Sequence, residues 1–501
     1  MSLHFKYTPL TFLKDLNQIK VQVKNTIILG YFYNRNQKVV KLKNLIEGTQ
    51  YGYNASAMPS GRNKFLRISD ITDGEVNWDT VPFCDCSDEK TYLLQKNDLL
   101  IARTGGTTGK SFLIDTPPSN AIYAGYLIRI RANELSEPRF LNLFLNSYAY
   151  WSQVLSLNKG DFRPSVNATK LKNLVLPNCT LQEQNDAIKI ANGETVDGYE
   201  ELIQQIKQTL LEFDNCQEVI NEYKSQKQLI TQLKQSILQE AIQGKLTAEW
   251  RTARQAQEPP LEDASELLKR IKAEKAQLVK EKKIKKEKPL PPITEEEIPF
   301  ELPEGWVWCR LGDITTYGSS EKLDSSDIQS DTWVLDLEDI EKESSKIIQT
   351  KCFKERPSLS TKSVFKKGWV LYSKLRPYLD KVVVAPNDGV CTTEILPLPI
   401  YSDLNPKFLM FTMKSKHFLQ YVNSKVGGMK MPRLGTNDGK LALLPIASVS
   451  EQQEIVKKVE TLMQHCEALE KEIENSEANA QMLMQSVLKE AFEGEVKKEM
   501  V

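Results

Sequence analysis

QSILQEAIQGKL (Gln235–Leu246) and QSVLKEAFEGEV (Gln485–Val496) are two copies of one pattern, and they decide how the chain is organised. Six of their twelve positions are identical, and the second copy starts 250 residues after the first. Self-similarity at a long, fixed distance indicates a duplicated structural unit. In each copy a glycine follows helix-forming residues, which is typical of the end of a helix.

Further matches upstream of these copies extend the duplication over most of the chain. At a shift of 268 residues, Lys172, Leu176-Pro177 and Glu183-Gln184 recur as Lys440, Leu444-Pro445 and Glu451-Gln452. At a shift of 269 residues, Leu66, Asp70 and Ile71 recur as Leu335, Asp339 and Ile340. We infer that each copy is a globular stretch followed by a long helix.

The globular stretches contain both strand and helix patterns. Short runs rich in β-branched and other apolar residues, bounded by Gly, Pro or Asn, predict strands; they are NDLLIAR (97–103), YLIRIRA (126–132), GWVLYSK (368–374) and KVVVAP (381–386). The run PRFLNLFLNSYAYWSQVL (138–155) is apolar at helical spacing. The predicted fold class is therefore α/β in the mixed α+β sense, with two duplicated globular domains.

The long helices carry apolar residues at seven-residue steps, the pattern of a coiled coil. The first helix has one seam at Tyr199, Ile206, Phe213 and Ile220 and another at Leu202, Thr209, Cys216, Tyr223, Ile230 and Ile237. The second has Val459, Cys466, Ile473, Ala480 and Val487 in one seam, and Leu462, Leu469, Ser476 and Leu483 in the other. We expect the two helices to pair antiparallel, which would separate the globular domains with approximate two-fold symmetry. The alternative is that each seam packs only against its own domain. Lys227, Lys234 and Ser476 interrupt the seams and could fix their register or face a partner.

Composition excludes several classes of chemistry. The 66 basic and 66 acidic residues give no net charge, so any contact with nucleic acid must come from local patches. Only three histidines are present, which leaves little for histidine-based catalysis or metal binding. The eight cysteines are scattered apart from Cys84 and Cys86, so neither a disulfide framework nor a zinc site is expected. No secretory signal or membrane span is predicted, and a cytoplasmic location fits.

The loop ARTGGTTGKS (Ala102–Ser111) resembles a phosphate-binding loop, which raises the alternative of a nucleotide hydrolase using Gly109-Lys110-Ser111. A P-loop needs a helix after the lysine, whereas SFLIDTPP reads as a strand that ends in prolines. The equivalent stretch of the second copy is SKLRPYLDK (Ser373–Lys381), which keeps the cations and has no glycine. Both loops offer exposed donors suited to phosphates and guanine edges, so we expect DNA contacts. Two ordinary surface hairpins remain the alternative.

Two further loops carry the same kinds of residue. They are SLNKGDFRPSVNATKLK (156–172), with its counterpart NSKVGGMKMPRLGTNDGK (423–440), and the basic loop SGRNKFLR (60–67). The candidate DNA-binding residues are Arg62, Asn63, Lys64, Arg103, Thr104, Gly105, Gly106, Thr107, Thr108, Lys110, Lys159, Arg163, Lys374, Arg376, Tyr378, Lys381, Lys430 and Arg433. No catalytic, cofactor-binding or metal-binding residue is predicted.

Several stretches together resemble the specificity subunit of type I restriction-modification enzymes. They are ELPEGWVWCRLGDI (301–314), VLDLEDI (334–340), GWVLYSKLRPYLDKVVVAP (368–386), LLPIASVSEQQEIV (443–456) and QLKQSILQEAIQGKLTAEW (232–250). The resemblance implies two target recognition domains, at 1–180 and 302–450, and two helical spacers, at 181–246 and 451–501. A charged helix and a Pro-rich linker fill 247–301; its lysine run at 282–288 is either a solvated helix end or a contact to a partner subunit or DNA.

The same resemblance implies function. Each domain would read one half of a split, asymmetric sequence in double-stranded DNA, and the helices would set the gap between the halves. Such a subunit is not itself an enzyme. It would recruit two methyltransferase subunits that use S-adenosylmethionine, and motor-nuclease subunits that use ATP and magnesium; no cofactor, membrane or small-molecule substrate is expected for this chain. A protein-binding scaffold without DNA is the remaining alternative, and so is service to a methyltransferase that has no nuclease partner.

Overall fold

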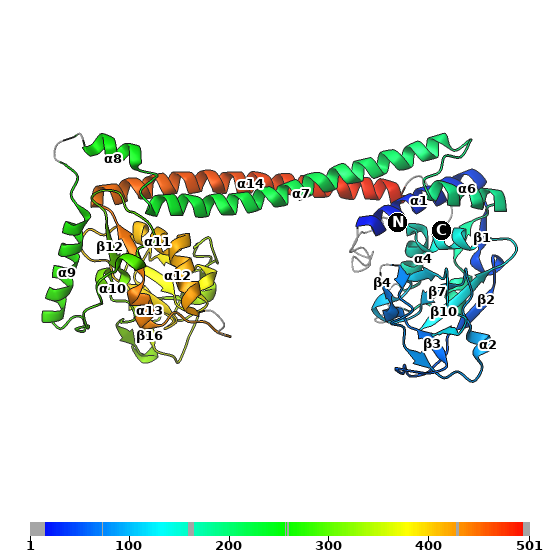
Figure 1. Cartoon of the computed structure of the whole chain (residues 1–501), viewed down its shortest axis with the longest axis horizontal. Coiled ribbons are helices and arrows are strands. Elements are labelled where there is room, and N and C mark those ends of the chain that lie inside the picture. Colours follow the sequence, from blue (N-terminus) through cyan, green and yellow to red (C-terminus); the bar gives the residue numbers. More distant parts are fainter. Residues whose placement is uncertain are drawn as a thin grey trace. The chain divides into compact units, whose positions relative to one another are not determined.

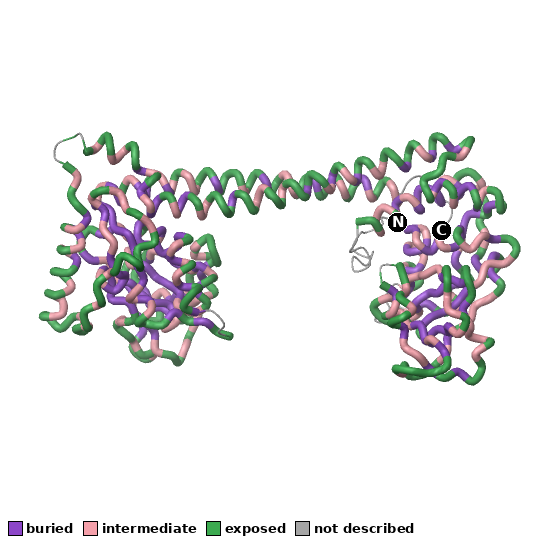
Figure 2. The backbone as a smooth tube through the Cα atoms, viewed as in Figure 1, coloured by how far each residue is buried: buried purple, intermediate pink, exposed green. Residues whose placement is uncertain are grey.

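The computed structural model describes residues 16–72, 74–158, 165–255, 257, 260–426 and 430–493, which fall into two compact units (Figure 1). Unit 1 comprises the described residues up to Glu222 and those from Ser476 onward, and unit 2 comprises Tyr223–Asn475. The helices α7 (Glu200–Ile242) and α14 (Val449–Glu493) each contribute one segment to each unit. Buried residues gather in the globular part of each unit and recur along the helices (Figure 2).

Unit 1 is built on two small sheets. The first has the antiparallel order β2-β10-β7-β8, and the second has the order β6-β3-β9 with β3 parallel to β9. These strands are β2 (Ile46–Tyr51), β3 (Asn63–Leu66), β6 (Phe83–Cys84), β7 (Leu99–Ala102), β8 (Ser111–Leu113), β9 (Ala121–Tyr123) and β10 (Leu127–Ala132). The predicted strands at 97–103 and 126–132 are thus confirmed as β7 and β10.

Helices and short elements complete unit 1. The predicted helical run at 138–155 forms α3 (Pro138–Leu145) and α4 (Tyr148–Leu157), which are separated where Ser147 caps the second helix. The remaining elements are α1 (Leu16–Asn36), β1 (Val39–Lys41), η3 (Leu42–Asn44), η4 (Ile68–Asp70), β4 (Ile71–Thr72), β5 (Glu75–Val76), α2 (Glu89–Tyr92), η5 (Gly105–Thr107), α5 (Ala168–Lys172), β11 (Val175–Pro177) and α6 (Leu181–Ala191).

Unit 2 repeats this plan. One sheet has the order β18-β17-β20, and another has the order β13-β16-β19-β14-β15, in which β14 is parallel to β19. The strands are β12 (Val307–Arg310), β13 (Lys322–Leu323), β14 (Trp333–Leu335), β15 (Lys351–Cys352), β16 (Lys362–Phe365), β17 (Val370–Ser373), β18 (Val382–Val384), β19 (Gly389–Cys391), β20 (Ile395–Leu398) and β21 (Leu443–Ile446). The helices are α8 (Ala248–Gln255), α9 (Ala264–Lys280), η6 (Glu295–Glu297), α10 (Leu311–Ile314), η7 (Ser325–Asp327), η8 (Leu337–Asp339), η9 (Pro377–Leu379), α11 (Pro406–Lys414), α12 (Lys416–Val426) and α13 (Thr436–Leu441).

The duplication inferred from sequence holds down to individual hydrogen bonds. Gln184 on α6 is 1% exposed, and its Oε1 accepts from the backbone N–H of Glu137 at 2.8 Å. Gln452 on α14 is 0% exposed, and its Oε1 accepts from the backbone N–H of Asn405 at 2.9 Å. Both pairs are related by the same shift of 268 residues. The repeated glutamine therefore fixes the start of α3 in one unit and of α11 in the other.

The two long helices run antiparallel, as predicted. In unit 2, Lys234 on α7 forms an ion pair with Glu470 on α14 at 2.6 Å, and Lys458 on α14 donates to the carbonyl of Leu246 at 2.9 Å. Residue numbers thus rise along one helix as they fall along the other. The interruption at Lys234 therefore sits at a contact that can fix the register, one of the roles considered for it.

Three of the four predicted seams are largely buried, and the fourth is not. Positions such as Phe213, Ile237 and Val459 are 1%, 6% and 0% exposed. Leu469 and Leu483 of the fourth seam are 47% and 59% exposed, so that prediction was wrong. Helix α14 instead turns the neighbouring stripe inward, where Glu470 meets Lys234. A polar residue occupies the seam because its charge has a partner on the opposite helix.

The described residues contain no helix long and apolar enough to cross a membrane. The segment between the repeats is packed rather than free, because Ala264, Leu267 and Ile271 of α9 lie in the core of unit 2. In that same unit, Glu451 is 2% exposed and accepts hydrogen bonds from Trp306, Thr247 and Arg251. Motifs from three separate stretches of sequence therefore meet at one buried carboxylate.

Candidate nucleic-acid interface

The glycine loop of unit 1 closes a β-hairpin between β7 and β8. Ala102 N–H donates to the carbonyl of Lys110 at 2.9 Å, and Gly109 N–H donates to the carbonyl of Ala102 at 2.8 Å. Residues Gly105–Thr107 form the 3-10 turn η5, and a strand follows the loop instead of a helix. The loop therefore lacks the helix N-terminus that a P-loop uses to bind phosphate, which argues against the nucleotide-hydrolase alternative.

Several groups of this loop face solvent. Thr104, Gly105 and Gly106 are exposed, and Thr107 and Lys110 are half-buried. The Arg103 guanidinium lies over the ring of Tyr51, 4.9 Å from its centroid, and donates to the carbonyl of Gly125 at 3.5 Å. Thr108 is 6% exposed, because its hydroxyl donates to the Gly105 carbonyl at 2.8 Å and closes the turn.

A second predicted loop lies directly against the first. Val166 N–H donates to the carbonyl of Arg103 at 2.8 Å, and Thr104 forms a β-bridge with Ser165. Lys159 and Arg163, the candidates on this second loop, lie outside the described residues. The part that is described shows that the two loops form one continuous surface.

The third predicted loop is only partly available to a ligand. Arg62 is exposed, whereas Asn63 is 0% exposed. The Asn63 amide donates to Glu89 at 3.0 Å, and its oxygen accepts from Cys86 N–H at 3.2 Å. Asn63 therefore holds the domain together and is not free to contact a base, which corrects its assignment as a DNA-binding residue. The Lys64 ammonium donates to the carbonyl of Val81 at 3.1 Å and lies 4.2 Å from the ring centroid of Phe83.

In unit 2 the corresponding loop contains the 3-10 turn η9. Arg376 and Tyr378 are exposed, and Lys374 is half-buried. The ammonium of Lys381 donates to the carbonyl of Leu337 at 2.6 Å, and burial lowers its pKa. Lys381 therefore secures the loop from below, and its ammonium is occupied within the unit.

The neighbouring loop of unit 2 repeats the contact found in unit 1. Arg376 N–H donates to the carbonyl of Pro432 at 2.8 Å, and Leu434 N–H donates to the carbonyl of Lys374 at 3.0 Å. Arg433 is exposed and pairs with Glu394 at 3.0 Å, while Lys430 is exposed. The contact from Leu434 to Lys374 is the counterpart of that from Val166 to Arg103.

Sequence reasoning missed the residues that support these loops from beneath. Tyr51 stacks under Arg103, and its hydroxyl accepts from the backbone N–H of Ala168 at 3.1 Å, so it joins the two loops of unit 1. Lys414 is 7% exposed and supports the loop of unit 2. A lysine inside an otherwise apolar helix, PKFLMFTMK, was the available signal for the second of these.

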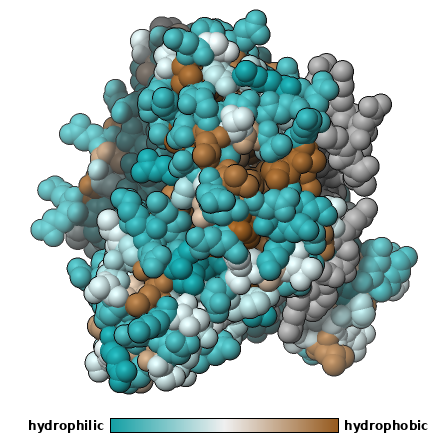
Figure 3. Space-filling model, turned by 90° about the vertical axis from the view of Figure 1, so that its right-hand side faces the viewer, coloured by the Kyte–Doolittle hydropathy of each residue, from teal (hydrophilic) through white to brown (hydrophobic). Residues whose placement is uncertain are grey.

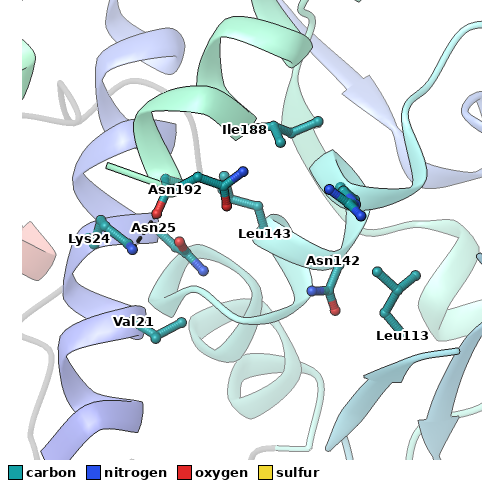
Figure 4. Close-up of a pocket in the computed structure, with 10 residues that line it drawn as sticks. Val21, Lys24, Asn25, Leu113, Asn142, Leu143, Ile188 and Asn192 are labelled. Carbon is teal, nitrogen blue, oxygen red and sulfur yellow. Dashed lines mark hydrogen bonds between the residues drawn. The ribbon is translucent and has the colours of Figure 1, made fainter. Parts of the chain in front are cut away.

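Neither a metal site nor an enzyme-like cleft is found at these loops. Among the residues that the structure describes, no three His, Cys, Asp or Glu side chains cluster as metal ligands would. A cavity of about 310 Å³ lies in unit 1 between α1, α3 and α6 (Figure 4). Its Lys24 and Asn25 already donate to the carbonyls of Ala191 and Asn146, so these two groups are occupied. The outer face drawn in Figure 3 is largely hydrophilic around a smaller hydrophobic cluster.

Known proteins resemble this chain over about half of its length. Residues 34–212 match the family model of the type I restriction modification DNA specificity domain. The EcoAI specificity subunit of Escherichia coli is 33% identical over 270 residues, 52% of this chain and 44% of the relative. The EcoDI specificity subunit of Escherichia coli is 29% identical over 269 residues, 54% of each chain. The chain thus spans about half the length of these curated relatives.

A crystal structure of the HsdS subunit from Thermoanaerobacter tengcongensis covers 91% of this chain and 96% of its own, with 18% identity and a TM-score of 0.45. So loose a superposition adds nothing to the sequence matches. The family model and the curated relatives agree with each other. On their strength, the chain belongs to the family of type I restriction-modification specificity subunits.

Proposed function

We propose that this chain is the DNA-recognition subunit of a type I restriction-modification complex and has no catalytic activity of its own. In this proposal the globular parts, at 1–180 and 302–450, each bind one half of a split, asymmetric duplex sequence. The helical spacers at 181–246 and 451–501 set the gap between the halves and carry two methyltransferase subunits, with the linker at 247–301 between the repeats. Motor-nuclease subunits complete the complex, which works in the cytoplasm.

The construction of the paired loops is the observation that carries the proposal. Each unit joins two loops through the same backbone hydrogen bond, from Val166 to Arg103 in one and from Leu434 to Lys374 in the other. The exposed side chains differ, with threonine and glycine in unit 1 and Arg376 and Tyr378 in unit 2. A shared scaffold with different exposed groups is what two readers of different base sequences require, since base edges are read by side-chain contacts.

The chemistry of the complex belongs to its partners in this proposal. S-adenosylmethionine would be bound by the methyltransferase subunits, and ATP and magnesium by the motor-nuclease subunits. The recognition loops supply cations and backbone amides, which suit phosphate oxygens and guanine edges.

Salt-dependent binding tests the proposal. The full chain, purified with its methyltransferase subunits, is titrated with duplex DNA from the host genome at several salt concentrations. Phosphate contacts release counterions, so the logarithm of the affinity falls linearly with that of the salt concentration. Replacing Arg376 with Ala should lower the steepness of this line by about 1 if its guanidinium contacts a phosphate.

Lys416→Ala provides the matched control, because it also removes one exposed cation of unit 2 but lies on α12 and not on a recognition loop. It should leave the salt dependence unchanged. Binding that ignores salt, or an equal effect of both substitutions, would contradict the proposal and favour a protein-binding scaffold.

A further inference from the structure

The recognition loops of the two units adopt the same backbone conformation with different residues. Gly105 and Gly109 have φ angles of +83° and +89°. The residues 271 positions later, Arg376 and Asp380, have φ angles of +49° and +48°. Glycine adopts this left-handed region freely, whereas a residue with a Cβ atom does so only at a cost in free energy. Unit 2 must therefore stabilise its loop in another way.

A single buried ammonium group provides this stabilisation. Lys414, the last residue of α11, is 7% exposed. Its Nζ donates to Asp380 Oδ2, to the hydroxyl of Ser345 and to the carbonyl of Glu343, each at 2.7 Å. These three bonds use all three hydrogens of the ammonium. Lys414 thus joins the recognition loop to a second loop at 343–345.

The second loop is held in the same unusual conformation. Glu343 and Ser345 have φ angles of +63° and +59°, so four of the non-glycine residues with left-handed backbone lie in the two loops that Lys414 connects. Backbone bonds also join the loops, because Glu343 N–H donates to the carbonyl of Leu379 at 3.1 Å. Strained backbone of this kind persists only where surrounding contacts fix it, and it is concentrated at binding sites.

Asp380 depends on this lysine. Asp380 is 4% exposed, and among the described residues its Oδ1 has no hydrogen-bond partner. Burial raises the pKa of the carboxyl group to about 6, and Lys414 acts in the opposite direction. Without Lys414, the carboxylate would be buried with no compensating charge, which is strongly unfavourable.

Unit 1 shows what the loop looks like without this device. The position equivalent to Lys414 is Asn146, whose amide donates to the carbonyl and side-chain oxygen of Asn142 at 3.0 Å. The position equivalent to Asp380 is Gly109. Neither residue carries a charge, because glycine needs no support in the left-handed region.

We propose that Lys414 is a positioning residue for DNA recognition by unit 2, acting by locking loops 343–345 and 376–381 into one rigid reading surface. This rests on the proposed function of the chain. Because the lysine lies under one unit only, its effect is confined to one half of the DNA target. Lys414 does not itself touch DNA, since its ammonium is fully engaged within the protein.

The test uses the full chain with its methyltransferase subunits and maps methylated sites in genomic DNA, base by base, in both halves of the target. Arg376→Ala identifies which half belongs to unit 2. Lys414→Met should reduce methylation about tenfold or more and relax base preference in that same half, because it leaves the Asp380 carboxylate without its partner. Lys416→Met, an equal substitution at an exposed lysine of α12, should change neither half.

A double variant keeps the inference testable even if Lys414→Met fails to fold. Asp380→Gly with Lys414→Asn reproduces the residues of unit 1 and removes the buried carboxylate together with its partner. It should restore recognition of the unit 2 half. The inference is overturned if Lys414→Met affects neither half, if it affects both halves equally, or if the folded double variant does not recover. A wild-type chain that directs no methylation would instead refute the proposed function.

Discussion

Glycines at 106 and 109 lie in the same loop but have different structural roles. Gly109 has a φ angle of +89°, and a Cβ atom there would lie 2.9 Å from the ring of Trp151. Gly106 is not in the left-handed region, and a Cβ atom there would have no neighbour within 4 Å. The first glycine is thus required by the backbone and by packing, while the second leaves room for contact with DNA.

Gly109→Ala is therefore expected to destabilise unit 1 by about 1–3 kcal/mol, because alanine would be strained in the left-handed region. Chemical denaturation measures this loss. Gly106→Ala is the control and should leave stability nearly unchanged. Equal stability of the two variants would contradict the structural role given to Gly109.

His417 makes unit 2 sensitive to acid. It lies beside the rings of Phe300 and Trp308, with centroids 5.8 Å and 5.7 Å away, and its Nε2 is 3.1 Å from the carbonyl of Leu443. Burial lowers the pKa of His417 below its ordinary value of 6.5. The unfolded chain therefore binds a proton at a higher pH than the folded chain does, so stability falls as pH drops below 6.5.

His417→Gln should remove this part of the pH dependence. The free energy of unfolding is measured by urea denaturation from about pH 5 to 8, the range in which histidine titrates. His465→Gln serves as the control, because His465 is exposed on α14. A wild-type protein whose unfolding free energy shows no component removed by His417→Gln would rule out the effect.

The candidate site shows where sequence alone reaches its limit. Basic residues in repeated loops identified the surface, and the structure brings the loops together through Arg103 and Lys374. Sequence could not show that Asn63 is buried or that the ammonium of Lys381 is bound inside the domain. Whether a polar side chain faces solvent or its own domain is decided by neighbours distant in sequence.

The helix pair is held by apolar positions that face the partner helix. Ile237 on α7 is 6% exposed, whereas Leu233, one turn earlier, is 47% exposed. Ile237→Ala should lower the stability of unit 2 by about 2–5 kcal/mol, because it removes buried methyl groups and leaves a cavity. Leu233→Ala should change stability by no more than about 0.5 kcal/mol.

Thermal or chemical unfolding of both variants decides the matter. If Leu233→Ala were the more damaging change, the assigned inner face of α7 would be wrong.

The heptad pattern predicted the helices and their antiparallel pairing, but misplaced one seam. Leucine at 469 and 483 suggested an apolar stripe, yet these side chains are exposed, and Glu470 faces α7 instead. A charged residue can occupy a seam when the opposite helix supplies a partner, here Lys234 at 2.6 Å. Periodicity of one helix alone does not contain that information.

The duplication explains why so much of the fold could be predicted from one sequence. Strands β7 and β17 and the hairpin loops that follow them recur at a constant shift, and so do the buried glutamines Gln184 and Gln452. Two copies of one pattern act as a comparison within the chain: what recurs is the scaffold, and what differs is the exposed surface. The bases that each surface recognises depend on docked geometry and cannot be predicted in this way.

Methylation-aware sequencing of the host genome, with and without this gene, tests the central claim most directly. We predict that deletion abolishes methylation at one split, asymmetric motif and that restoring the gene brings it back. Arg376→Ala should then alter the bases accepted in only one half of that motif. An unchanged set of methylated motifs in the deletion strain, with the methyltransferase partner expressed, would contradict the claim that this chain directs a DNA methyltransferase to its target.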